Sequence, residues 1–174
     1  MVYRRYLAHF GHTKILEYQP ITRGHFKNIQ DHDDCLIHNW NKTIDPKDIV
    51  IHVGDFAFGS REFCFKIRTR LNGNIFMIPG NHDSSEAIKK SFACFKESLK
   101  IKIDDWIAYC NHYAHMTWPN KHDKCIHCHG HSHGFLGHDL KNKRFDVGVD
   151  CWNLTPVSFD TLKNLAIVQE DYQI

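Results

Sequence analysis

The sequence predicts an α/β protein in which short strands alternate with helices. Short runs rich in valine, isoleucine and phenylalanine recur along the chain, as expected for buried strands. Longer stretches between them repeat their apolar residues every three or four positions, which is typical of amphipathic helices. The chain has 174 residues, of which 42% are hydrophobic and 24% charged, and this suits one well-packed domain over residues 1–174.

Six segments have the composition of strands. They are residues 2–7, 49–53, 75–78, 107–110, 126–128 and 145–149. No repeat, low-complexity tract or linker interrupts their succession. We therefore expect one continuous fold rather than separate modules.

Three helices are expected between these strands. Residues 30–43 place Trp40 on an apolar face, and residues 61–71 follow Ser60, a favourable N-cap. Ser84 or Ser85 is expected to cap a third helix that ends near residue 93.

Polar side chains follow four of the predicted strands, at the point where each strand ends. In chain order they are Asp55, then Asn81 with His82, then His112, then His131 with His133. Open α/β sheets bind their ligands beyond the carboxyl ends of the strands. The repeated placement indicates that these side chains converge on one site.

The donor types indicate metal chemistry. A carboxylate, an amide and several imidazoles suit borderline divalent metals such as Zn, Mn, Fe or Ni, and the chain contains 15 histidines. Asp55 is able to bridge two cations, a typical arrangement for phosphate ester cleavage. His82 would then protonate the leaving group as general acid, with Asp83 orienting its ring.

Simpler interpretations exist for each residue taken singly. Asp55 and Asn81 also suit turns, and a lone histidine such as His112 is more often structural. Cys125, Cys128 and His129 form a C-x-x-C-H pattern that resembles a structural zinc site. The two cysteines alternate within a predicted strand, which favours core packing instead.

Charge and cysteine usage limit the classes of partner. The formal net charge is +2, and the basic residues are dispersed rather than arranged as a nucleic-acid-binding stripe. No apolar run approaches 18 residues, and the first residues lack the apolar segment of a secretory leader, so we expect no membrane association. Seven dispersed cysteines favour reduced thiols and a cytoplasmic location.

Taken in order, the motifs resemble those of calcineurin-like metallophosphoesterases, of the small single-domain kind common in bacteria and phages. The resemblance spans nearly the whole chain. It rests on His9-Phe10-Gly11-His12, Gly54-Asp55, Gly80-Asn81-His82-Asp83, Asn111-His112, Gly130-His131-Ser132-His133 and Val147-Gly148-Val149-Asp150.

The resemblance implies a four-layer α-β-β-α sandwich with two divalent metal ions at one edge. It implies that Asp55 bridges the ions and that His9 and His133 complete the shell of the first. Asn81, His112 and His131 would bind the second. A metal-bound hydroxide would attack phosphorus, with His82 as acid or transition-state stabiliser. The implied substrate is a small phosphorylated molecule: a phosphodiester, a nucleotide-like phosphate or a nucleic-acid end.

One position departs from the family pattern. An aspartate is expected two residues before His9, and Leu7 stands there. The first metal would lose a ligand and a negative charge. An alternative function is therefore a weakened relative that binds a nucleotide or phosphate without efficient turnover. Arg23 is a candidate for clamping a phosphate oxygen nearby.

Overall fold

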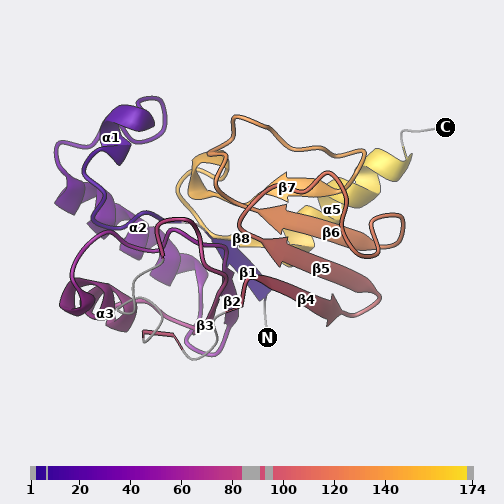
Figure 1. Cartoon of the computed structure of the whole chain (residues 1–174), viewed down its shortest axis with the longest axis horizontal. Coiled ribbons are helices and arrows are strands. Elements are labelled where there is room, and N and C mark those ends of the chain that lie inside the picture. Colours follow the sequence, from indigo (N-terminus) through magenta and orange to yellow (C-terminus); the bar gives the residue numbers. More distant parts are fainter. Residues whose placement is uncertain (1–2, 7, 84–90, 93–95, 172–174) are drawn as a thin grey trace.

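The structure is a computed structural model that describes residues 3–6, 8–83, 91–92 and 96–171. Leu7 lies outside the described residues. So does most of the helix expected between residue 84 or 85 and residue 93. The described chain forms two four-stranded sheets with helices beside them (Figure 1).

The first sheet has the strand order β3-β2-β1-β8. Strands β1 (Tyr3–Tyr6), β2 (Ile49–His52) and β3 (Asn74–Met77) are parallel, and β8 (Val157–Ser158) pairs antiparallel with β1. Because β2 and β3 are parallel neighbours, the residues that follow them emerge at the same edge of the sheet.

The second sheet has the order β4-β5-β6-β7. Strand β4 (Ser98–Ile103) pairs antiparallel with β5 (Trp106–Asn111). Strands β5, β6 (Cys125–His129) and β7 (Arg144–Asp146) are parallel. The carboxyl ends of β5 and β6 thereby bring His112 and the segment after His129 together.

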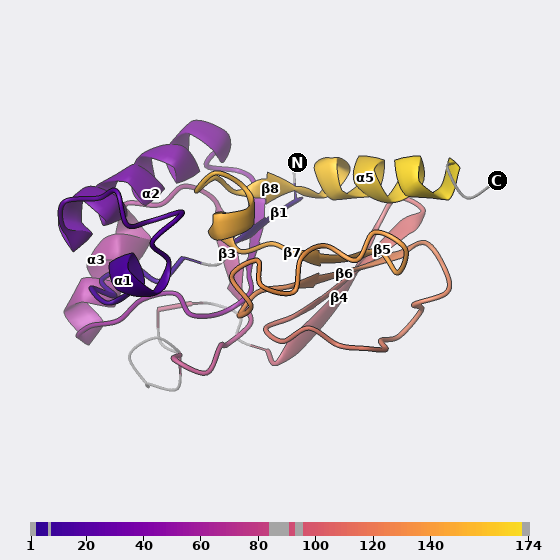
Figure 2. The ribbon, with the colours of Figure 1, turned by 90° about the horizontal axis from the view of Figure 1, so that it is seen from above.

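The helices form two groups (Figure 2). Helices α1 (Ile15–Tyr18), α2 (Ile29–Thr43) and α3 (Arg61–Thr69) lie beside the first sheet, and α5 (Phe159–Asp171) runs from β8 alongside the second. A short 3-10 helix spans Val149–Cys151. The predicted N-cap of α3 is confirmed, since Ser60 accepts the backbone N–H of Phe63.

Two apolar cores hold the layers together. The first lies between α2, α3 and the first sheet and contains the fully buried Trp40, Val50 and Phe56. The second lies between the sheets and includes Ile51, Ile126 and, from α5, Leu162. The expected α/β class, with two sheets and flanking helices, is confirmed. Among the described residues, no helix has the length and apolar character needed to span a bilayer.

The elements differ from expectation in several places. Strands β4 and β8 and helices α1 and α5 were not predicted. The strand expected over 145–149 ends at Asp146, because Asp146 Oδ1 accepts the N–H of Gly148 at 2.8 Å and turns the chain. Strand β6 is longer than expected and is buried along its whole length.

Candidate metal centre

Asp55 lies just beyond β2 and is almost fully buried, with 1% of its surface exposed. Gly54 precedes it with φ of 101°, a conformation that L residues rarely adopt. Burial by itself would raise the pKa of the carboxyl. The hydrogen bond from His9, and the charges that His9 and His112 carry when acid protonates them, hold that pKa below its ordinary value. Asp55 is therefore an ionised carboxylate at neutral pH, ready to bind cations.

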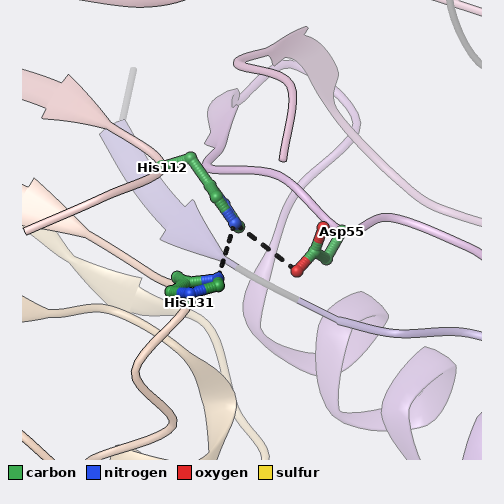
Figure 3. A group of neighbouring side chains, drawn as sticks. All are labelled: Asp55, His112 and His131. Atoms are coloured by element: carbon green, nitrogen blue, oxygen red, sulfur yellow. Dashed lines mark hydrogen bonds and ion pairs between the residues drawn. The ribbon is translucent and has the colours of Figure 1, made fainter. Parts of the chain in front are cut away.

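A candidate metal-binding group lies on one side of Asp55. Figure 3 shows Asp55, His112 and His131 facing one another. One donor atom from each of the three lies within 4.8 Å of the others. His112 Nε2 is 3.5 Å from Asp55 Oδ2, 3.2 Å from His131 Nδ1 and 3.1 Å from Asn81 Oδ1. Two donor atoms of one ion lie about 3 to 3.6 Å apart when each is about 2.0–2.2 Å from the metal. The distances from His112 Nε2 to the other three donors match those between ligands of one divalent cation.

The tautomer of His112 also suits a metal ligand. Its Nδ1 is 2.6 Å from the carbonyl oxygen of Val53, which only accepts hydrogen bonds, so Nδ1 carries the proton. Burial lowers the pKa of the ring and keeps it neutral. Nε2 then presents its lone pair to the group around Asp55.

Two further histidines lie on the other side of Asp55. His9 Nε2 is 3.3 Å from Asp55 Oδ2, and the ring centroids of His9 and His133 lie 4.7 Å apart. Burial lowers the pKa of His9 to about 3, so its ring is neutral at pH 7. His133 Nδ1 lies 2.8 Å from Asp150 Oδ2.

The backbone is strained at four of the residues expected to bind metal. His9, Asp55, His131 and His133 have φ values of 68°, 52°, 64° and 46°, in the left-handed region that residues with a Cβ usually avoid. Such conformations cost energy and persist where the surroundings enforce them, typically at functional sites. All four belong to the ligand set expected from the sequence.

The role expected for Asp83 is corrected by its hydrogen bonds. Asp83 was expected to orient the ring of His82, but both of its carboxylate oxygens accept backbone N–H groups. Oδ2 accepts from Gly80 at 2.8 Å and from Asp55, and Oδ1 accepts from Phe56 at 3.0 Å. Asp83 fixes the turn that carries Asp55.

His82 itself is exposed at the rim of the site. Its backbone N–H donates to Asp55 Oδ1 at 3.1 Å, and its ring lies 4.6 Å from that of Phe58. Phe58 also stacks on His12, with ring centroids 4.1 Å apart. This aromatic neighbour was not singled out from the sequence, because its only local signal is an ordinary apolar residue in a loop.

Arg23 has a different place from the one expected. It was a candidate phosphate clamp, but its side chain is fully buried and is paired with Asp150. Burial opposes ionisation of Asp150, but its hydrogen bonds to Arg23 and His133 hold the pKa of the carboxyl below its ordinary value. Neither the pair nor its contact with His133 was foreseen from the sequence.

The cysteines of the C-x-x-C-H pattern lie in β6. Cys128 packs in the core between the sheets, and the thiol of Cys125 donates to the carbonyl of Pro119 at 3.4 Å. His129 Nδ1 faces the carbonyl of Gly130. Among the residues that the structure describes, these three form no metal-binding cluster.

This combination of sheets and site belongs to a known class of protein. The family model for calcineurin-like phosphoesterases matches residues 12–168, and the chain belongs to that family. The family typically binds divalent metals and hydrolyses phosphoesters, in keeping with the Asp55, His112 and His131 group.

The chain is also similar to individual proteins. It is 28% identical over 170 residues to the uncharacterized protein MJ1445 of Methanocaldococcus jannaschii, covering 91% of this chain and 86% of the relative. A protein of unknown function from Aquifex aeolicus, AQ665, has the same fold, with a TM-score of 0.73 and 21% identity over 94% of this chain and 98% of its own. A structure described as a novel archaeal phosphodiesterase matches with a TM-score of 0.47 and 19% identity, over 75% and 73% of the two chains.

Proposed function

We propose that this chain hydrolyses a phosphoric ester with two divalent ions bound on either side of Asp55. One observation carries the proposal: Asp55 Oδ2 is 3.3 Å from His9 Nε2 and 3.5 Å from His112 Nε2. A single carboxylate oxygen with an imidazole on each side suits a bridging ligand. Mixed nitrogen and oxygen donors favour Mn, Fe, Zn or Ni.

The remaining ligands divide between the two positions. His9 and His133 would hold one ion, and Asn81, His112 and His131 the other. When bound, the ions would supply Lewis acidity and lower the pKa of an attacking water. The exposed ring of His82, beside Asp55, would protonate the leaving oxygen or stabilise the transition state.

The substrate would be a phosphodiester or a nucleotide-like phosphate, including a nucleic-acid end. A cavity of about 340 Å³ adjoins Asn81 and His112, a volume suited to a small phosphorylated molecule. Tyr113 also lines it and is 47% exposed, which leaves one aromatic ring available to the substrate. A cytoplasmic location is part of the proposal.

The test is hydrolysis of bis-p-nitrophenyl phosphate and p-nitrophenyl phosphate with added Mn²⁺. The wild-type chain is expected to release nitrophenol, chiefly from the diester. Asp55→Asn should abolish the reaction and His82→Ala should reduce it at least tenfold. His122→Ala, a change at an exposed histidine, is the matched control. Wild-type activity no higher than that of Asp55→Asn would refute the proposal.

The alternative function rests on Leu7, where the family pattern has an aspartate. A weakened relative would bind a nucleotide or phosphate without efficient turnover. It predicts tight phosphate binding by calorimetry, negligible hydrolysis by the natural chain, and a gain of activity in Leu7→Asp. Hydrolysis by the unmodified chain would exclude it.

A further inference from the structure

Arg23 is a fully buried cation that the proposed chemistry does not use. Burying a guanidinium costs several kcal/mol unless a well-aligned anion compensates for it. The compensating anion is Asp150, which accepts two hydrogen bonds from Arg23. Nε of Arg23 donates to Oδ1 at 2.8 Å, and Nη2 donates to Oδ2 at 2.7 Å. Thr22 adds a hydroxyl bond of 2.6 Å to Oδ1.

The carboxylate of Asp150 also contacts a proposed metal ligand. Its Oδ2 also lies 2.8 Å from His133 Nδ1. Because the ionised carboxylate only accepts hydrogen bonds, His133 Nδ1 must donate, and Nε2 keeps its lone pair. Carboxylates that hold a metal-binding histidine in this way fix its tautomer and raise its basicity.

The far side of Arg23 reaches the other proposed ligand of the same ion. Arg23 Nη1 donates to the carbonyl of Ala8 at 2.7 Å, and Ala8 directly precedes His9. A second anchor follows His9, where Asp33 Oδ2 accepts the N–H of Gly11 at 2.9 Å. The strained backbone of His9, with φ of 68°, is thus fixed on both sides.

The two anchors are parts of one network. Asp33 Oδ1 lies 2.9 Å from His32 Nδ1, and His32 Nε2 lies 3.2 Å from Arg23 Nη1. Arg23, His32 and Asp33 are all buried. The network therefore spans from the turn after His9 to the ring of His133 without passing through solvent.

We propose that Arg23 and Asp150 are positioning residues, which hold His9 and His133 in place to bind the first of the two metal ions. This inference rests on the proposed function. It explains how a site with Leu7 in place of an acid still assembles: a buried ion pair fixes its two imidazoles before metal arrives. Removing such a partner of a metal ligand typically lowers metal affinity about 10- to 100-fold.

The test is Mn²⁺ binding by isothermal titration calorimetry, with metal content measured after dialysis. The wild-type chain should bind two ions. Asp150→Asn should weaken one site 10- to 100-fold and leave the other, around His112, unchanged. Asp105→Asn, which breaks an exposed ion pair with Lys124, is the control and should bind both ions normally. If Asp150→Asn binds both ions with wild-type affinity, this inference is overturned but the proposed function is not.

Asp150→Asn leaves Arg23 without its anion and is at risk of unfolding, so two further measurements accompany it. Thr22→Val keeps the ion pair and should weaken the same site about two- to tenfold.

Nitrogen-15 NMR of the metal-free wild type, with His133 assigned by the loss of its signals in His133→Asn, should show the Nδ1–H tautomer. The Nε2–H tautomer would overturn the inference. No Mn²⁺ binding by the wild type would overturn the proposed function, and this inference with it.

Discussion

The carboxylate of Asp83 accepts the backbone N–H of Asp55, so one buried acid holds another in place across 28 residues of sequence. The same oxygen accepts the N–H of Gly80, and the second oxygen accepts that of Phe56. Burial raises the pKa of Asp83. Asp83 therefore acts on the site through the geometry of the loop rather than as a ligand.

Asp83→Asn is expected to destabilise the protein and weaken metal binding at the same time. The amide has one acceptor oxygen, so at least one of the three backbone N–H groups loses its partner, at about 1–3 kcal/mol. Urea unfolding in the presence of chelator measures the loss of stability, and Mn²⁺ titration measures the loss of affinity. Wild-type stability in this variant would show that the loop does not depend on Asp83.

Gly80→Ala is expected to disrupt the Asp55 carboxylate directly. A Cβ at Gly80 would overlap Asp55 Oδ1 and lie 2.7 Å from His112 Cε1. Because both neighbours are buried, one of these ligands must move, and Mn²⁺ affinity should fall at least tenfold. Gly137→Ala is the control: nothing lies within 4 Å of its Cβ, and its positive φ costs only about 1–2 kcal/mol. Equal Mn²⁺ affinity in both variants would count against this placement of the ligands.

Metal binding is expected to stabilise the fold. An ion that binds only the native state adds RT ln(1 + [L]/Kd) to the free energy of unfolding, about 2.7 kcal/mol at 100 times Kd. Thermal unfolding with Mn²⁺ should shift upward, and chelator should reverse the shift. His131→Asn should lose at least half of it, whereas the exposed His122→Asn should keep it. A melting temperature that does not respond to Mn²⁺ in the wild type would contradict this expectation.

The sequence was informative where signals are local. His112 directly follows a strand, Asp55 and Asn81 come shortly after strands, and glycines beside these two mark the turns. The parallel pairing then brings the strand ends together, as the α/β pattern predicts. These positions could be expected without knowing any long-range contact.

The missed features depend on contacts between distant residues. Arg23 and Asp150 are separated by 127 positions, and neither carries a local sign that it pairs with the other. Helix α5 was missed because its apolar residues are spread around it: Leu162 is fully buried, whereas Ile167 is 36% and Val168 52% exposed. In the structure, α5 packs against β8, β1 and β6.

Acid is expected to destabilise the protein through His127. Burial lowers its pKa to about 3, and its Nε2 accepts the N–H of His115 at 3.0 Å, a bond that protonation would break. An unfolded histidine has a pKa near 6.5, so between about pH 6.5 and pH 3 the unfolded chain binds the extra proton and stability falls as pH falls. The contribution is up to about 1.4 kcal/mol of unfolding free energy per pH unit.

In urea unfolding at pH 7.5, 6.0 and 5.0, His127→Gln should lose less stability between pH 6.0 and 5.0 than the wild type, since Gln does not titrate. The exposed His122→Gln should follow the wild type. The same loss in all three proteins would mean that other groups, such as the buried His9 and His52, account for the acid sensitivity.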